Sequence, residues 1–186
     1  MPMKPFVRMA VALIVAQLGG LALAQQSPTL NVEGPAPKLR LQMSPYTLHF
    51  SSDEKHENVY LAGLEREHAN GKLDGLVLFS NSFGQESAFL YPWGGIYHHI
   101  WGVQPLSFKW TAGLLYGYKE PYEDKVPLNY KGFSPGVILA MAYEFKPGWS
   151  VQVDMLGTAG LTFQLNVPLN LRTSGAVNSV KKALRT

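Results

Sequence analysis

The chain has 186 residues, a formal net charge of +3, no cysteine, and 46% hydrophobic and 12% aromatic residues. Its length predicts a single domain, and the absence of cysteine excludes a disulfide scaffold, a thiolate metal centre and a cysteine nucleophile. The small charge gives no reason to expect nucleic acid as a partner, and a charged share of 16% is low against the roughly 25% of an ordinary soluble domain.

The N-terminus carries the pattern of an export signal. Lys4 and Arg8 precede an apolar stretch that runs from Met9 to Ala24 and ends in Ala-Leu-Ala. A basic start, a short apolar core and a small-residue cleavage site are typical of a secretory signal peptide. The alternative, a membrane anchor, is disfavoured because a glutamine and two glycines interrupt the core. We therefore predict that residues 1–24 are a signal peptide, cleaved after Ala24.

Residues 25–44 contain Pro28, Pro35 and Pro37, which disfavour a long helix. We expect a periplasmic N-terminal segment here. It is either a plain linker or a short amphipathic turn over residues 37–43, in which Lys38 and Arg40 would meet lipid headgroups.

The rest of the chain alternates between large apolar residues and small or polar ones. From Leu106 to Tyr118, thirteen residues alternate without interruption, which is long for a soluble strand. The alternation returns over residues 137–145, 149–155 and 161–167, and less cleanly over 46–50, 58–67, 74–82 and 88–100. Strict alternation predicts strands with one apolar face, so the sequence predicts eight strands.

The two faces of these strands decide the fold class. The face with small residues is too rich in glycine and alanine to form the only core, so the large apolar face is best explained by contact with lipid. Strands can cross a bilayer only as a closed barrel, because open edges would leave backbone groups unpaired. We therefore predict an all-β fold: an eight-stranded antiparallel outer-membrane β-barrel over residues 45–169, followed by a basic C-terminal tail over 170–186.

The predicted lumen has two halves. If the chain starts in the periplasm, the long connections (52–57, 83–87 and 119–132) lie outside the cell. Inward polar residues then gather in the periplasmic half: Lys109, Glu144, Gln152, Asp154, Gln164 and Asn166. Small and apolar inward residues gather in the outer half: Gly113, Leu115, Gly117, Gly136, Ile138, Ala140 and Leu156.

An eight-stranded barrel is too narrow for an aqueous pore. The polar half can simply fill the lumen, although a special role for its charges stays open. The apolar half suits a hydrocarbon chain entering from the outer leaflet, with ordinary interior packing as the alternative. On the first reading Gly113, Leu115, Gly117, Ile138 and Ala140 would bind the substrate.

Candidate chemistry lies at the outer rim. His49 ends the first strand and points inward, and Asn81-Ser82 ends the third strand, roughly 10 Å away at ordinary strand spacing. A histidine that accepts a proton and a hydroxyl that can be activated are the minimum for acyl transfer. The alternative is that His49 is an ordinary surface residue near a loop.

These residues resemble the PagP-type lipid A palmitoyltransferases, which are eight-stranded outer-membrane enzymes. Thr47-Leu48-His49 resembles the family's histidine at the outer end of the first strand, and Phe79-Ser80-Asn81-Ser82 resembles its Asp-Ser pair. The resemblance covers residues 44–169, mostly as a pattern. It implies transfer of a palmitoyl chain from a phospholipid donor to lipid A, by His49, Asn81 and Ser82, with the apolar half of the lumen measuring the chain.

The chain departs from the family at Asn81, where the family has aspartate. Asparagine can orient a neighbour or donate to an oxyanion but cannot act as a base, and Asp53 or Glu54 can compensate. We expect a monomer in the outer membrane that needs no metal or cofactor. The alternatives are a lipid A deacylase with the same residues, and a non-enzymatic structural or adhesive barrel.

Overall fold

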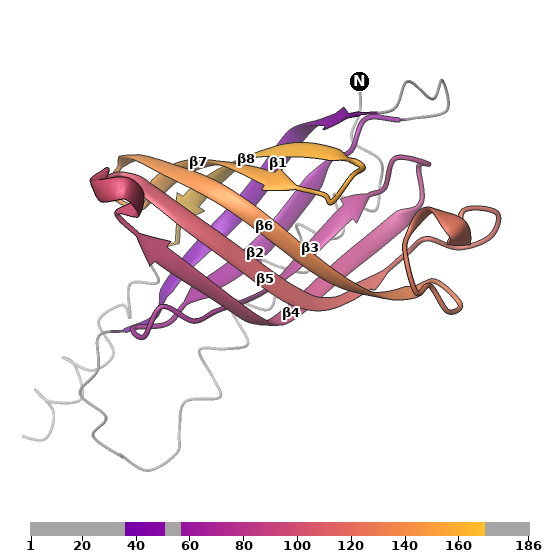
Figure 1. Cartoon of the computed structure of the whole chain (residues 1–186), viewed down its shortest axis with the longest axis horizontal. Coiled ribbons are helices and arrows are strands. Elements are labelled where there is room, and N and C mark those ends of the chain that lie inside the picture. The colour runs from indigo at the N-terminus through magenta and orange to yellow at the C-terminus, as the bar shows by residue number, and fades with distance from the viewer. Residues whose placement is uncertain (1–35, 51–56, 170–186) are drawn as a thin grey trace, which may run out of the picture.

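The computed structural model describes residues 36–50 and 57–169. Eight strands fill most of this span: β1 (Lys38–His49), β2 (Leu61–Glu67), β3 (Leu73–Ser80), β4 (Glu86–His98), β5 (Leu106–Tyr116), β6 (Phe133–Lys146), β7 (Trp149–Met155) and β8 (Gly160–Pro168). Each strand pairs antiparallel with the next, and β8 pairs with β1, so the sheet closes on itself (Figure 1). The predicted all-β, eight-stranded antiparallel barrel is confirmed.

The connections differ at the two ends of the barrel. One end, here called the site end, has the connections after β1, β3 and β5, and the last of these (117–132) projects beyond the barrel and contains the short 3-10 helix η2 (Glu123–Lys125) (Figure 1). The other end, the turn end, has the connections after β2, β4 and β6, with the 3-10 helix η1 (Ile100–Gly102) after β4. No helix within residues 36–50 and 57–169 is long and apolar enough to cross a membrane.

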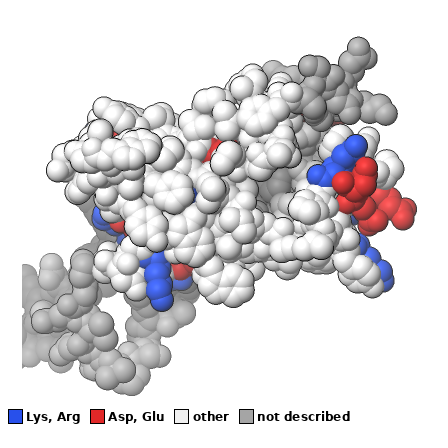
Figure 2. Space-filling model, viewed as in Figure 1, with Lys and Arg blue, Asp and Glu red and all other residues white. Residues whose placement is uncertain are grey.

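Alternation places the large apolar side chains on the outside of the barrel. Exposed apolar residues occur on most strands, among them Leu48, Leu76, Leu90, Trp93, Leu114, Val137, Leu139, Tyr143, Val151, Met155 and Phe163. On the face seen in Figure 2, charged atoms gather at the two ends and the wall between them carries few. The outer wall is therefore an apolar band with polar rims.

The first strand begins earlier than the sequence suggested. The expected linker or amphipathic turn over residues 37–43 is instead strand, since β1 starts at Lys38 and pairs with β2 from its first residue. Arg40, Gln42 and Ser44 are buried in the interior, whereas Met43 is exposed. The nearby prolines obscured this alternation, although Pro37 precedes the strand and removes no donor from it.

Strand pairing is incomplete at the site end. Pairing of β1 with β2 stops at Ser44, and within the described residues Tyr46–His49 pair with β8 alone. Pro45 lies at this point, where it has no N–H to give a neighbouring strand. The Ser44 hydroxyl donates to Tyr46 O at 3.1 Å and accepts from Tyr46 N at 3.3 Å. Strand β6 likewise pairs with β7 only from Leu139 onward, so β5 is the one strand of the described residues that pairs with residues 133–138.

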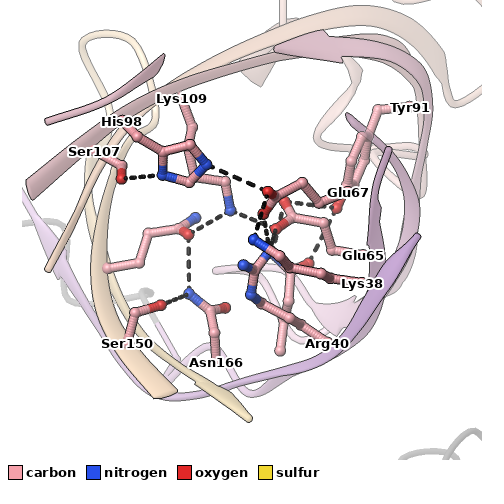
Figure 3. Close-up of polar contacts among 12 residues, drawn as sticks. Lys38, Arg40, Glu65, Glu67, Tyr91, His98, Ser107, Lys109, Ser150 and Asn166 are labelled. Atoms are coloured by element: carbon pink, nitrogen blue, oxygen red, sulfur yellow. Dashed lines mark hydrogen bonds and ion pairs between the residues drawn. The ribbon is translucent and has the colours of Figure 1, made fainter. Parts of the chain in front are cut away.

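The interior divides into two regions. Toward the turn end it is filled by buried polar side chains that point toward one another across the barrel (Figure 3). Lys109 Nζ donates to Glu65 Oε1 at 2.6 Å and to Gln152 Oε1 at 2.7 Å, and Arg40 lies 2.6 Å from Glu67 Oε2. Toward the site end the buried cluster is apolar: Val77, Phe89 and Tyr91, with Leu61, Phe79, Leu115 and Ile138 against it.

Candidate active site

The site end of the barrel contains a cavity of about 530 Å³, a size typical of small-molecule sites. Its walls are mostly apolar and come from β2, β3, β4, β5 and β6: Leu61, Val77, Phe79, Phe89, Leu115, Ile138 and Ala140. Its floor is polar and comes from the buried network, through Gln42, Glu65, Tyr91, Lys109, Gln152 and Asp154. The half of the lumen that was predicted to be apolar therefore corresponds to the open cavity at the site end. The half that was predicted to be polar corresponds to the filled region toward the turn end.

His49 and Ser82 meet at the mouth of this cavity. His49 Nε2 lies 2.6 Å from Ser82 Oγ, and both residues line the cavity. His49 ends β1 and Ser82 follows β3, so the two backbones lie two strands apart in the sheet order. The sequence therefore suggested roughly 10 Å between the two backbones. The two side chains reach each other because β2 begins only at Leu61. No residue of β2 pairs with the last residues of β1, so no β2 backbone separates His49 from Ser82 there.

The β3–β4 turn fixes the position of Ser82. The Ser82 carbonyl accepts a hydrogen bond from Glu57 N at 2.7 Å, which ties the turn to the segment leading into β2. A Cβ added to Gly84 would lie 3.0 Å from both carboxylate oxygens of Glu57, so this carboxylate also lies against the turn. The other carboxylates considered from the sequence, Asp53 and Glu54, lie outside the described residues.

Asn81 is completely buried, and its amide organises the turn. Asn81 Oδ1 accepts from the backbone N–H groups of Phe83 and Gln85, each at 3.0 Å. Asn81 Nδ2 donates to Gln85 Oε1 at 3.3 Å and to Gly117 O at 3.4 Å. Both ends of the amide are therefore engaged within the protein, and this arrangement explains why asparagine suits the position, since an aspartate would lose both donated bonds.

The structure separates the five predicted substrate-binding residues into two groups. Leu115, Ile138 and Ala140 line the cavity, whereas Gly113 and Gly117 do not. A Cβ on Gly113 would lie 2.0 Å from Leu90 O, and one on Gly117, whose φ is +135°, would lie 2.1 Å from Ser87 Oγ. Gly113 permits close approach of β4 to β5 next to the irregular register between Leu90 and Trp93, and Gly117 permits it just beyond the end of β5.

Sequence reasoning missed much of the lining. Val77 on β3 and Phe89 on β4 form part of the apolar wall. Tyr91 closes the cavity from below by donating to Gln42 Oε1 at 3.2 Å and to Glu65 Oε2 at 3.4 Å. Tyr118 also lines the cavity, near its mouth. The alternation of Ser87, Phe89 and Tyr91 carried a usable signal, because all three are buried and share one face.

The arrangement joins two functional elements of acyl chemistry. An imidazole paired with a hydroxyl can move a proton to and from an attacking or leaving oxygen, and an apolar cavity beneath the pair can hold a hydrocarbon chain. Comparison of the chain with protein-family models and with curated proteins found no match.

Proposed function

We propose that this protein is an outer-membrane acyltransferase that moves a palmitoyl or similar fatty acyl chain from a phospholipid to lipid A, as its resemblance to the PagP-type palmitoyltransferases implies. The observation that carries the proposal is the 2.6 Å contact between His49 Nε2 and Ser82 Oγ at the mouth of the apolar cavity. A reacting ester at this pair would leave its hydrocarbon chain in the cavity below.

In the proposed reaction, His49 accepts the proton of a lipid A hydroxyl, directly or through Ser82 Oγ. The hydroxyl oxygen then attacks the carbonyl carbon of the phospholipid ester, and the carbonyl oxygen takes up the negative charge. Collapse of this intermediate breaks the bond to the glycerol oxygen, which leaves with the proton from His49. The products are a lysophospholipid and an acylated lipid A, and no other reactant is consumed.

The outer wall supports a place in a lipid bilayer. Its exposed apolar side chains, its scarcity of charge between the two ends and its closed sheet are the features that a bilayer-spanning barrel requires. The same wall in water would expose a large contiguous apolar surface, which monomeric soluble proteins rarely do.

The incomplete pairing offers routes from the bilayer to the pair. Cavity-lining residues flank the gap where β6 does not pair with β7, with Gly136 and Ile138 on the β6 side and Leu156 and Ala159 on the other. Val137 lines the cavity and is also 64% exposed, so the cavity reaches the outer surface at this point. An acyl chain would enter sideways here without passing the charged rim.

The polar floor supports a cavity that ends at a fixed depth. Tyr91, Gln42 and Glu65 are joined by hydrogen bonds, and Glu65 is in turn held by Lys109. An alkyl chain gains nothing by displacing such groups, because the exposed partners would lose their hydrogen bonds. We expect the chain terminus to stop above Tyr91.

The test is mass spectrometry of lipid A from Gram-negative cells that express the wild type, His49→Ala or Ser82→Ala. We expect a mass gain of one acyl chain with the wild type and at least a hundredfold less product with either variant, since positioned acid–base groups contribute 10²-fold or more. His99→Ala, at the turn end of the barrel, is the matched control and should retain activity.

Two other results would replace the proposal. A loss of one acyl chain from lipid A would identify a deacylase that uses the same pair. An unchanged lipid A mass with a correctly folded wild type would favour a structural or adhesive barrel.

A further inference from the structure

Tyr118 is a polar residue at the cavity that the reaction above does not use. It follows β5 directly, at the start of the β5–β6 connection, and lines the cavity together with His49 and Ser82. No hydrogen bond joins its hydroxyl to a residue of the described ranges 36–50 and 57–169, whereas its backbone carbonyl accepts one from Asn129 Nδ2. Burial raises the pKa of Tyr118 to about 12, so the group stays protonated and acts as a donor at physiological pH.

The position of Tyr118 is tied to the turn that carries Ser82. The Tyr118 carbonyl accepts from Asn129 Nδ2 at 2.7 Å, and the preceding Gly117 carbonyl accepts from Asn81 Nδ2. The Phe83 ring, next to Ser82, packs edge-on to the Tyr118 ring with 6.4 Å between centroids. These contacts hold the ring and the Ser82 turn against each other at the mouth of the cavity.

Acyl transfer needs a donor for the oxyanion that forms on the carbonyl oxygen, and removal of one such donor typically costs 10²–10³-fold in kcat. Asn81 cannot supply it in this arrangement, because both its donor hydrogens are directed to Gln85 and Gly117. Tyr118 is half-buried and lines the cavity, so its hydroxyl can donate to a ligand oxygen there.

Resting on the proposed function, we propose that Tyr118 Oη donates a hydrogen bond to the ester carbonyl oxygen of the acyl donor and stabilises the oxyanion. The lipid A oxygen forms its bond to the carbonyl carbon as its proton passes to His49. The carbonyl electron pair moves onto the oxygen that Tyr118 holds and returns when the glycerol oxygen leaves with that proton. Tyr118 keeps its own proton throughout.

The kinetic test compares Tyr118→Phe with the wild type, using the full chain in detergent micelles with dipalmitoyl phosphatidylcholine and lipid A. We expect kcat to fall by roughly 10²-fold while KM for the phospholipid changes less than threefold, because the phenyl ring keeps its packing. Tyr122→Phe is the matched control, since Tyr122 stacks on the same Phe83 from the same connection, and it should keep wild-type kcat. An unchanged kcat in Tyr118→Phe, or an equal loss in Tyr122→Phe, would overturn the assignment.

A second measurement reads the hydrogen bond without turnover and so separates this proposal from the proposed function. Infrared difference spectra of phosphatidylcholine with ¹³C-labelled ester carbonyls are recorded on His49→Ala protein with and without Tyr118→Phe. We expect a carbonyl band shifted to lower frequency that Tyr118→Phe abolishes. A band that is the same in both proteins, or no bound carbonyl band at all, would reject Tyr118 as a donor whatever the wild type does to lipid A.

Discussion

The two halves of the barrel interior differ in how far inward side chains fill the lumen. Toward the turn end, inward side chains are long, polar and bonded to one another, and they fill the lumen (Figure 3). Toward the site end, the cavity walls are mostly apolar below the polar residues of the mouth, and about 530 Å³ stays open. The polar region therefore closes the lumen toward the turn end and forms the floor that fixes the depth of the apolar cavity.

Removing one partner of the polar region should have the largest effect. In Lys109→Met, the carboxylate of Glu65, which is 1% exposed, loses its closest cation. We expect a loss of about 3–5 kcal/mol in the free energy of unfolding, because breaking a buried pair leaves an uncompensated charge. Urea unfolding in micelles measures it.

Two variants sharpen this result. Lys72→Met removes an exposed lysine near the turn end and should change stability by less than about 0.5 kcal/mol. The double variant Lys109→Met, Glu65→Gln should recover part of the loss, since it removes both charges. A loss in Lys109→Met as small as that in Lys72→Met would contradict the view that the polar region holds the barrel closed.

A charge placed on the outer wall of the barrel should lower its stability, whereas the polar region of the interior requires its charges. Leu139 points outward from β6 and is 38% exposed. If the wall faces lipid, Leu139→Arg should cost about 2–4 kcal/mol of stability in vesicles, as arginine does near a bilayer midplane. Folding of Leu139→Arg and wild type into vesicles across a urea series tests this, and equal midpoints would argue that the wall faces water.

We expect the β3–β4 turn, which carries Ser82, to prefer asparagine at position 81. Asn81→Asp would set carboxylate oxygens against Gly117 O and Gln85 Oε1, which now accept from the amide. We expect a loss of about 1–3 kcal/mol, the cost of leaving buried polar groups unsatisfied, without a gain in acyl transfer. A more active and equally stable Asn81→Asp protein would show that the site instead needs a carboxylate.

Filling the cavity half should change which chain is transferred with little change in stability. Ile138→Trp adds bulk inside the cavity, whereas Leu139→Trp adds it outside on the next residue of β6. Each methylene excluded from the cavity forfeits about 0.8 kcal/mol, or roughly fourfold in affinity. Competition between donors with 12-, 14- and 16-carbon chains should therefore shift toward the shorter chains in Ile138→Trp alone.

The sequence predicted the barrel well because its evidence is local. The uninterrupted alternation of residues 106–118 and the three runs after it correspond to β5, β6, β7 and β8 within a few residues. The start of β1 was wrong, because Pro35 and Pro37 suggested irregular structure while Arg40, Gln42 and Ser44 were already on the inner face. Propensity signals there competed with a weak alternation, and alternation decided the structure.

The site was predictable in part. His49 and Ser82 could be selected by their places at strand ends, but their 2.6 Å contact depends on where β2 pairing stops and on the turn that Asn81 holds. The same limit applies to Gly117 and to Tyr118, which alternation placed on the outer face but which lines the cavity. Alternation placed Gly117 in the lumen, whereas the close approach of Ser87, a long-range contact, gives it a different role.

The most direct test of the account is transfer by the purified, reconstituted protein from a phospholipid whose palmitoyl chain carries ¹³C. Mass spectrometry then follows the label in phospholipid, free fatty acid and lipid A. We expect the label to appear on lipid A with the wild type, and the amount of labelled lipid A to fall at least a hundredfold with His49→Ala or Ser82→Ala. Label that stays in the phospholipid, or reaches lipid A equally well with both variants, would contradict it.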